Sequence, residues 1–416
     1  MSPPSITTKT PLARFDPLAP DVLPDPYPHY ARLRCYDPIH WGLSDDPAVP
    51  GRWYITRLDD IVDVLKDSRF GREVHTVLPP ERIPPTPAAD RLLAEVAEGW
   101  MILRDPPVHT HLRGLVNRAF TPRMVARLTP DIEATAEQLI TAMEAETGPV
   151  DLLTAFALPL PIIMVAQVLG LPTTDRDQLM DWSRALAAVI DLNQTEAVRE
   201  RSRMALEALV SYLTTIIGQR RRQPQDDLLS ALIDVEHEGQ KLSDEELIGT
   251  VTHLLFVGND PVMHLIGNGI VTLLHHPDQM AWLRANPDRI EPAVDELLRY
   301  DSSVQMTFRY TLTDVELGGK RLHTGDHVAV VLGSANRDPA YHADPDRLDL
   351  TRPAANLLHF GKGIHYCLGA PLARIEGQIA INTLLRRLPQ ISLATDTLVW
   401  QKTAAVRGLQ TLPVKL

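Results

Sequence analysis

Cysteine is nearly absent from this sequence, which has 416 residues and only two cysteines. Two cysteines cannot build a disulfide framework or a cysteine-rich zinc scaffold, so we expect a reducing compartment and a cytoplasmic location. Basic residues are also outnumbered, with 41 Lys and Arg against 53 Asp and Glu, and the net charge is −12. An acidic chain without a long basic tract is a poor nucleic-acid binder, so we expect no nucleic-acid partner.

Long uninterrupted hydrophobic runs are missing as well. The most apolar stretch, residues 156–172, contains Pro159, Pro161 and Gln167, and it is shorter than the ~20 apolar residues that span a bilayer. We therefore expect a buried core helix there and no membrane partner. No Gly/Ser-rich linker or low-complexity run divides the chain. The sequence therefore predicts a single large domain over residues 1–416.

Helical periodicity dominates the rest of the pattern, above all between residues 110 and 292. Ser243 and Glu246 form a capping-box pattern, which predicts a helix that starts there and runs to about His275. Residues near 40–57 and 307–335 are instead rich in aromatic and β-branched side chains, which favour strands. The sequence therefore predicts a mainly α protein with a minor β portion.

The most informative segment is Phe-Gly-Lys-Gly-Ile-His-Tyr-Cys-Leu-Gly at residues 360–369. Its glycines at 361 and 363 allow the backbone to bend tightly and to approach a flat object. Cys367 follows this loop and is expected to open an amphipathic helix, and a helix N-terminus favours the thiolate over the thiol. Such a thiolate could bind a metal or act as a nucleophile, whereas the alternative is an inert buried thiol.

This segment resembles the heme-binding loop of the cytochrome P-450 monooxygenases, and the resemblance extends over nearly the whole chain. It implies the cytochrome P-450 fold, a heme b cofactor (iron protoporphyrin IX) and Cys367 as the axial ligand of the iron. A thiolate ligand favours cleavage of the O–O bond. Within the loop, the resemblance implies that the cofactor is bound by Phe360, Gly361, His365, Cys367 and Gly369.

A second segment, residues 105–113, resembles the family segment that lies beside one heme edge. Buried heme propionates need cationic partners, and His109 and Arg113 share a helix face because they are four residues apart. By resemblance, these two residues together with Arg309 and His365 are the expected propionate partners. The register of the strand around Arg309 leaves that assignment the most open.

Glu296 and Arg299 are three residues apart on a predicted helix. An exposed pair of this kind contributes only about 0–1 kcal/mol, but the neighbouring apolar residues favour burial. The pair resembles the family's Glu-x-x-Arg element, and residues 348–352 resemble the segment whose arginine, here Arg352, joins it. We therefore expect Glu296, Arg299 and Arg352 to be structural.

Residues 257–262 resemble the family's oxygen-activation segment, in which an acidic residue is followed by threonine. Here the acid is Asp260, but Pro261 occupies the threonine position, and we expect Gly258, Asp260 and Pro261 to form the catalytic segment. One hypothesis is that water or a substrate hydroxyl carries protons from Asp260. The other is chemistry that is substrate-assisted, peroxide-driven or non-hydroxylating, such as oxidative coupling. A third possibility is a heme sensor or carrier without catalysis.

The substrate is expected from family analogy to be an apolar or aromatic small molecule, and secondary metabolism is the expected class. The residues expected to contact it are Leu255, Phe256, Asn259, Val304 and Met306. His253, His264 and His275 recur every 11 residues, but about 16 Å of helix separates each from the next, which is too far to share a metal.

Electron supply has to come from elsewhere, because the sequence has no flavin, nicotinamide or iron–sulfur motif. We expect O2 as co-substrate and a ferredoxin-type electron donor with its reductase as partner. A basic patch that includes Lys362, Arg374, Arg118 and Arg123 is expected to steer an acidic donor.

Overall fold

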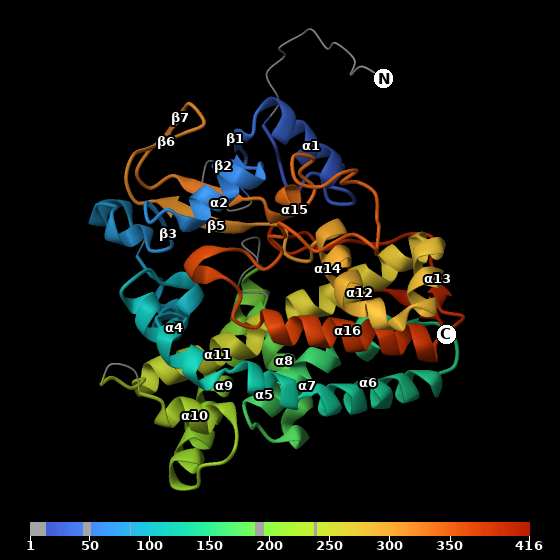
Figure 1. Cartoon of the computed structure of the whole chain (residues 1–416). Coiled ribbons are helices and arrows are strands. Elements are labelled where there is room, and N and C mark those ends of the chain that lie inside the picture. The colour runs from blue at the N-terminus through green and yellow to red at the C-terminus, as the bar shows by residue number, and fades with distance from the viewer. Residues whose placement is uncertain (1–13, 45–50, 84, 188–194, 237–238) are drawn as a thin grey trace.

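The computed structural model describes residues 14–44, 51–83, 85–187, 195–236 and 239–416. Helices form most of the molecule, and the strands of the largest sheet gather on one side of the helical part (Figure 1). The helices before residue 190 are α1 (Tyr27–Tyr36), α2 (Leu58–Lys66), α3 (Arg91–Ala97), α4 (Val108–Ala119), α5 (Pro122–Arg127), α6 (Thr129–Glu144), α7 (Pro159–Val168) and α8 (Arg176–Ala187). The later helices are α9 (Glu196–Arg222), α10 (Leu228–Asp234), α11 (Asp244–Val257), α12 (Asp260–His275), α13 (Pro277–Ala285), α14 (Ile290–Tyr300), α15 (Leu332–Ala335) and α16 (Ala370–Arg387).

The strands form three small sheets. The largest has the order β1-β2-β8-β5-β3, in which β2 and β8 are parallel and the other neighbours are antiparallel. A second sheet has the order β4-β10-β9, and β6 and β7 form a hairpin. The strands are β1 (Ile39–Gly42), β2 (Arg52–Ile55), β3 (Phe70–Gly71), β4 (Val150–Asp151), β5 (Thr307–Thr311), β6 (Val315–Leu317), β7 (Lys320–Leu322), β8 (His327–Val330), β9 (Ser392–Leu393) and β10 (Pro413–Lys415).

The predicted fold class is confirmed, but two local expectations need correction. Residues 332–335 form helix α15 and not a strand. Short strands also lie outside the two predicted β regions, at β3, β4, β9 and β10, because each pairs with a partner far away in the sequence. Such pairing depends on tertiary contacts and leaves little trace in local composition.

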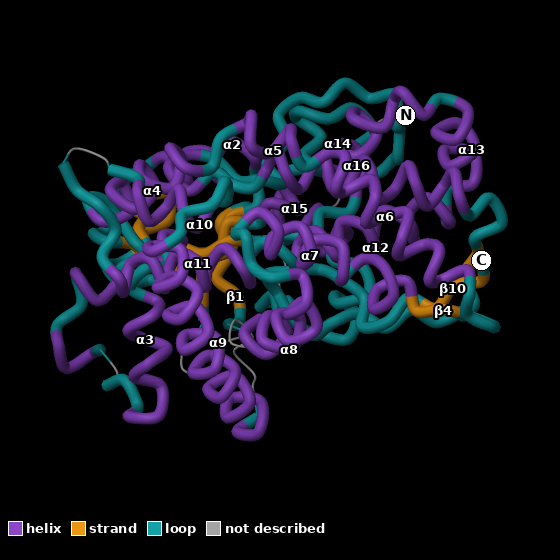
Figure 2. Tube along the Cα trace, turned by 90° about the horizontal axis from the view of Figure 1, so that it is seen from below, coloured by secondary structure: helices purple, strands orange, loops and turns teal. Residues whose placement is uncertain are grey.

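The main hydrophobic core lies among the helices, and a smaller cluster lies between α2 and the five-stranded sheet. Helix α16 packs against α6, α12 and α14, so it crosses the centre of the helical part (Figure 1). In the view turned by 90°, β4 and β10 lie at the edge next to the C-terminus (Figure 2). Among the described residues, every helix falls short of the length and apolar character needed to cross a membrane.

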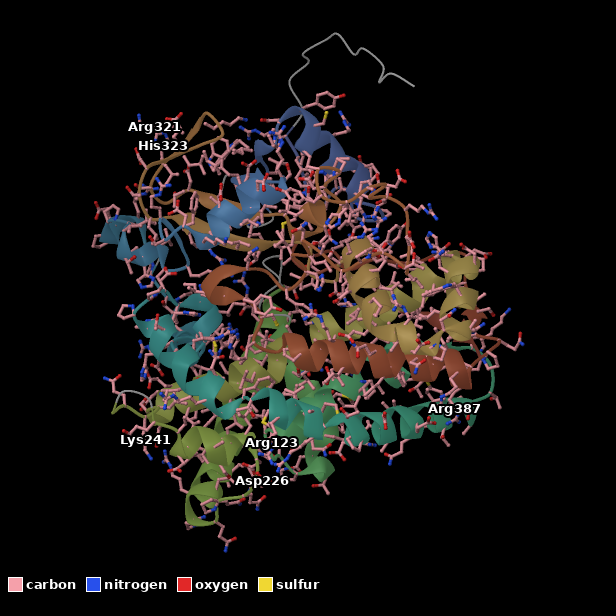
Figure 3. The ribbon with its side chains drawn as sticks, in the orientation of Figure 1. Arg123, Asp226, Lys241, Arg321, His323 and Arg387 are labelled. Atoms are coloured by element: carbon pink, nitrogen blue, oxygen red, sulfur yellow. The ribbon has the colours of Figure 1, made fainter. Side chains whose placement is uncertain are left out.

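Charged side chains mark the periphery of the molecule. Figure 3 shows Arg321 and His323 on the β6–β7 hairpin and Arg387 near the end of α16. Arg387 forms ion pairs with Glu137 and Glu144 of α6, so the end of α16 is tied to α6 at the surface.

The predicted helix from Ser243 to His275 is not continuous. Its start is as expected, because the Ser243 hydroxyl accepts from the Glu246 N–H and the Glu246 carboxylate accepts from the Ser243 N–H. However, α11 ends at Val257 and α12 begins at Asp260. Pro261 lacks an N–H, and its ring would clash with the carbonyl of Val257, four residues back. The proline therefore ends one helix and lies in the first turn of the next.

Candidate active site

A large cavity lies in the interior between the loop of residues 360–369 and the break between α11 and α12. It contains about 1440 Å³ of space outside protein atoms, part of which is open to solvent. Helices α4 and α16, strand β5 and the residues before it complete its lining. Cys367 lines the cavity from the loop side, and Gly258 and Pro261 line it from the helix side.

The loop that carries Cys367 is built around two glycines in left-handed conformation, Gly361 with φ 72° and Gly363 with φ 76°. Only glycine adopts such angles without steric cost. A Cβ atom at Gly363 would also lie 2.3 Å from the carbonyl oxygen of Leu65. The Cys367 N–H donates to the Phe360 carbonyl at 3.0 Å, which closes the loop and directs residue 367 to the cavity.

Cys367 does not open the following helix as expected, and its surroundings act on the pKa of its thiol in opposite directions. Helix α16 begins at Ala370, after Cys367. Burial raises the pKa of the Cys367 thiol, while hydrogen bonds from the Gly369 and Ala370 N–H groups and the charge of Arg113 lower it. The net shift is upward, because desolvation of the buried sulfur outweighs these donors.

One edge of the cavity is strongly basic. It contains all four residues that the sequence identified as propionate partners, and it adds Arg72: the group is His109, Arg113, Arg309, His365 and Arg72. They come from α4, from β5, from the cysteine loop and from the segment after β3, so only the tertiary structure brings them together.

These basic groups lack enough negative partners among the described residues. Burial and nearby positive charge lower the pKa values of Arg72, His109 and His365. Burial lowers the pKa of Arg309 to about 10, with only Asp105 acting in the opposite direction. Such a cluster is suited to bind an anion with two or more carboxylates. No pattern in the sequence indicates Arg72, which lies in an aperiodic segment.

The structural triad is buried next to this site. Arg299 donates to both carboxylate oxygens of Glu296, at 2.6 and 2.9 Å, and Arg352 donates to Glu296 at 3.3 Å. The side chain of Arg299 is 0% exposed and also donates to the carbonyls of Asn336, Pro345 and Arg347. The triad therefore ties α14 to the segment that leads towards the cysteine loop.

The break between α11 and α12 divides the expected catalytic segment. Gly258 and Pro261 face the cavity, but Asp260 does not line it. The Asp260 carboxylate lies 3.6 Å from Nε2 of His264, one turn along α12, and is 33% exposed. The acid therefore lies beside the cavity, and the break between α11 and α12 separates its carboxylate from the interior.

The expected substrate contacts are divided between the cavity wall and the packed interior. Val304 lines the cavity, but Leu255, Phe256, Asn259 and Met306 do not. Phe256 packs on Trp100, and Asn259 donates to the Ser183 hydroxyl at 2.9 Å. Met306 belongs to a separate hydrophobic cluster that includes Tyr27 and Tyr30 of α1. The cavity face follows the helical period through Leu254, Val257, Pro261 and Leu265.

Sequence reasoning also missed three buried polar residues of the cavity wall, namely His253, His359 and Glu376. His359 lies 3.5 Å from Asp295. Glu376 is 1% exposed, and burial raises its pKa to about 8. The three histidines spaced by 11 residues do not meet, and no group of three or more His, Cys, Asp or Glu in the described part is arranged to hold a metal.

The donor set fits one kind of cofactor. A single sulfur faces a large, mostly apolar cavity, and an excess of buried cations lies at one edge of it. A flat metal complex that carries carboxylates and takes one thiolate ligand matches both features. The geometry is that of a heme-thiolate protein.

Comparison with known proteins gives the same result. The sequence pattern of the Cytochrome P450 family matches residues 82–391. The chain is 38% identical to "Polyketide biosynthesis cytochrome P450 PksS" of Bacillus subtilis (strain 168), over 97% of this chain and 98% of that protein. It is also 38% identical to "Cytochrome P450 monooxygenase PikC" of Streptomyces venezuelae, over 98% and 95% of the two chains. The solved structure of "The cytochrome P450 enzyme CxnD for C-S bond formation in chuangxinmycin biosynthesis" matches with a TM-score of 0.82 at 34% identity, over 94% of each chain.

The chain belongs to the cytochrome P450 family. It is accordingly an oxidoreductase of the monooxygenase type that uses heme b, O2, an organic substrate and a redox partner.

Proposed function

We propose that this enzyme oxidises an apolar or aromatic secondary metabolite with O2 and with electrons from a separate ferredoxin-type donor. The observation that carries the proposal is the cavity, in which Cys367 faces an apolar helix wall. An apolar wall with few polar groups suits a hydrophobic small molecule. The names of PksS and of the CxnD structure support secondary metabolism as the setting.

In this proposal the loop and the basic edge would hold the heme. Cys367 would ligate the iron, and the propionates would be bound by His109, Arg113, Arg309, His365 and the additional Arg72. The Gly369 N–H hydrogen bond to the sulfur stabilises its negative charge, and Phe360 and Gly361 of the same loop line the cavity. Thiolate-ligated heme supplies oxygen activation. The positive charge of a bound iron would favour the ionised sulfur, in opposition to the burial that raises the pKa of Cys367.

In this proposal the residues at the helix break deliver protons to the cavity. Pro261 opens the backbone, so the Val257 carbonyl loses its usual helical donor. Asp260, which is partly exposed and beside His264, takes protons from solvent on the far side of α12. Gly258 adds no side chain, which leaves room for water to carry protons from the acid to the cavity.

The proposed donor docks near the cysteine loop. Lys362, Ile364 and Tyr366 are exposed there, and Arg118 and Arg123 are exposed on α4 and α5. Figure 3 shows Arg123 on the helical side of the molecule. Arg374 contributes less than expected, because it is paired with Asp295 at 2.9 Å and stacked over Phe360. An acidic ferredoxin suits the remaining cations.

The test of the proposed site is the absorption spectrum of the reduced, CO-bound protein beside a Cys367→Ala control. A strongly red-shifted Soret band that disappears in the control is the expected result. A protein that binds no heme, or a band that survives in Cys367→Ala, would contradict the assignment of Cys367.

A second candidate function is non-hydroxylating chemistry, such as oxidative coupling or bond formation assisted by the substrate. Two observations favour it: Pro261 has no hydroxyl at the cavity wall, and Asp260 faces His264 on the other side. Turnover under labelled oxygen (18O2) separates the candidates. A product that contains the label indicates hydroxylation, whereas an unlabelled oxidised product indicates coupling or desaturation.

A further inference from the structure

One polar side chain in the substrate part of the cavity has no partner. His253 is buried, with only 6% of its surface exposed, and it lines the cavity from α11. Neither of its ring nitrogens has a hydrogen-bond partner among the described residues. A buried polar group in this state is costly, so a ligand that bonds to it is favoured.

The ring is held in a fixed orientation by its neighbours. Trp100 stacks on it, with ring centroids 6.3 Å apart and planes at 20°, and Phe256 meets it edge-on at 5.9 Å. Thr252, the preceding residue on α11, is buried but does not line the cavity. His253 is therefore packed between two aromatic rings at the cavity wall, with both of its ring nitrogens buried and unpartnered among the described residues.

Two other buried histidines near the cavity differ from it. His264 and His359 each face a carboxylate, Asp260 at 3.6 Å and Asp295 at 3.5 Å. The charged group that acts on His253 is Arg113, and together with burial it lowers the pKa of His253 to about 4. At neutral pH the ring is therefore uncharged, with one N–H donor and one acceptor nitrogen.

We propose that His253 is a specificity-determining residue that binds a hydroxyl or carbonyl oxygen of the substrate. The inference rests on the proposed function, because it assumes that the helix wall faces the substrate. It adds a polar requirement to a substrate that is otherwise apolar. His253 lies five residues before Gly258, so this oxygen is placed about 7 Å along the helix axis from the break.

The experiment uses the heme-loaded enzyme and matched pairs of small ligands that differ by one oxygen. The pairs are cyclododecanol with cyclododecane and 4-phenylphenol with biphenyl. Affinity is measured by calorimetry and by the Soret shift of the resting enzyme. We expect the oxygen-bearing member to bind about five- to tenfold more tightly, which is the effect of one net hydrogen bond.

Variants of α11 then assign that preference to the ring. His253→Leu is expected to reduce the ratio of the two affinities to about one, while His253→Gln, which can still donate and accept, retains most of it. Thr252→Val, which removes a buried hydroxyl that faces away from the cavity, is the matched control and should leave the ratio unchanged.

Three outcomes would overturn the inference. The first is equal affinity for both members of each pair in the wild-type enzyme, and the second is a ratio that persists in His253→Leu. The third is faster heme transfer from His253→Leu to apomyoglobin with an unchanged ratio, which would assign the ring to the heme edge. The reduced, CO-bound spectrum separates these from failure of the proposed function, since only the latter removes the red-shifted band.

Discussion

The cavity has two walls that differ in how they are built. The loop wall, residues 360–369, is a short segment fixed by positive-φ glycines, a backbone hydrogen bond and adjacent cations. The helix wall consists of the cavity-facing residues between 253 and 265, and apart from His253 it is apolar or glycine. The loop wall retains the family pattern in every motif residue, whereas the helix wall departs from it at Pro261.

This difference separates two tasks. Binding a charged, flat cofactor requires fixed donors and cations, so it tolerates little variation in the loop wall. Accepting a hydrophobic molecule requires mainly shape, and polar groups there decide which molecule is accepted. We therefore expect changes that disturb the loop wall to affect folding and heme binding, and changes in the helix wall to affect ligand choice and proton delivery.

The largest effect is expected from breaking the buried triad that supports the loop side. Arg299→Ala leaves the Glu296 carboxylate, of which 2% is exposed, without its main partner. Loss of one partner of a buried pair costs about 3–5 kcal/mol. Urea unfolding measures this cost. The control is Arg69→Ala, whose pair with Asp67 is exposed and is expected to cost below about 1 kcal/mol. Equal losses in the two variants would show that the triad is not a buried support.

Glu376 tests the part of the cavity wall that α16 contributes. Its folded-state pKa of about 8 lies above the ordinary 4.5, so the neutral form is favoured by folding. Its contribution to stability is therefore complete below pH 4.5 and is lost as the pH rises to 8. Glu376→Gln removes this loss and should raise the free energy of unfolding by up to about 4 kcal/mol at pH 8, with little change at pH 4.

Thermal and urea unfolding at both pH values measure the effect of Glu376→Gln. The exposed Glu245, substituted in the same way, serves as the control and should change stability little at either pH. A Glu376→Gln variant whose stability follows the wild-type pH profile would contradict a protonated Glu376.

Gly363 tests the geometry of the loop wall. Gly363→Ala forces an alanine into φ 76° and brings its Cβ to 2.3 Å from the Leu65 carbonyl oxygen. Gly319 has the same φ of 76°, but a Cβ there meets no atom within 4 Å. We expect Gly319→Ala to cost about 1–2 kcal/mol from backbone strain alone, and Gly363→Ala to cost more and to reduce the heme content. Identical heme content in both variants would contradict the role of the close contact.

Pro261 tests the helix wall with the smallest expected change in stability. Pro261→Thr restores an N–H and a hydroxyl at the cavity, while Pro261→Ala restores only the N–H. If proton delivery limits the enzyme, Pro261→Thr should reduce peroxide release per electron pair by about tenfold or less. The measurement compares peroxide with donor oxidation in the presence of a ferredoxin and its reductase. Equal coupling in the two variants would show that the missing hydroxyl has no part in proton delivery.

Local signals in the sequence predicted several elements well. The Ser243 and Glu246 capping box is present with both hydrogen bonds, because its two residues are three apart and need no distant partner. The α2 helix (Leu58–Lys66) is another local case, since its buried residues Leu58, Ile61 and Val64 recur at helical spacing. The helix break was not placed from periodicity, since the apolar pattern continues through it, although Pro261 itself gave the necessary signal.

The face of α11 that lines the cavity could not be predicted from local signals in the sequence. Leu255 and Phe256 are as apolar as Leu254 and Val257, so composition could not tell which pair faces the cavity. The helical period fixes the angle between residues on one helix, but packing against the neighbours fixes the rotation of the helix as a whole. The shift by one position follows from that rotation.

The sequence by itself determined the family, the cysteine, the glycines that shape its loop and the proline that opens the helix, because each depends on residues within a few positions. The tertiary structure decided that Arg72 joins Arg309 and His109 at one edge, that Glu376 is buried and that His253 has no partner. These properties depend on which distant segments meet. A side chain becomes buried, and its charge gains or lacks a partner, only where segments distant in the sequence pack together.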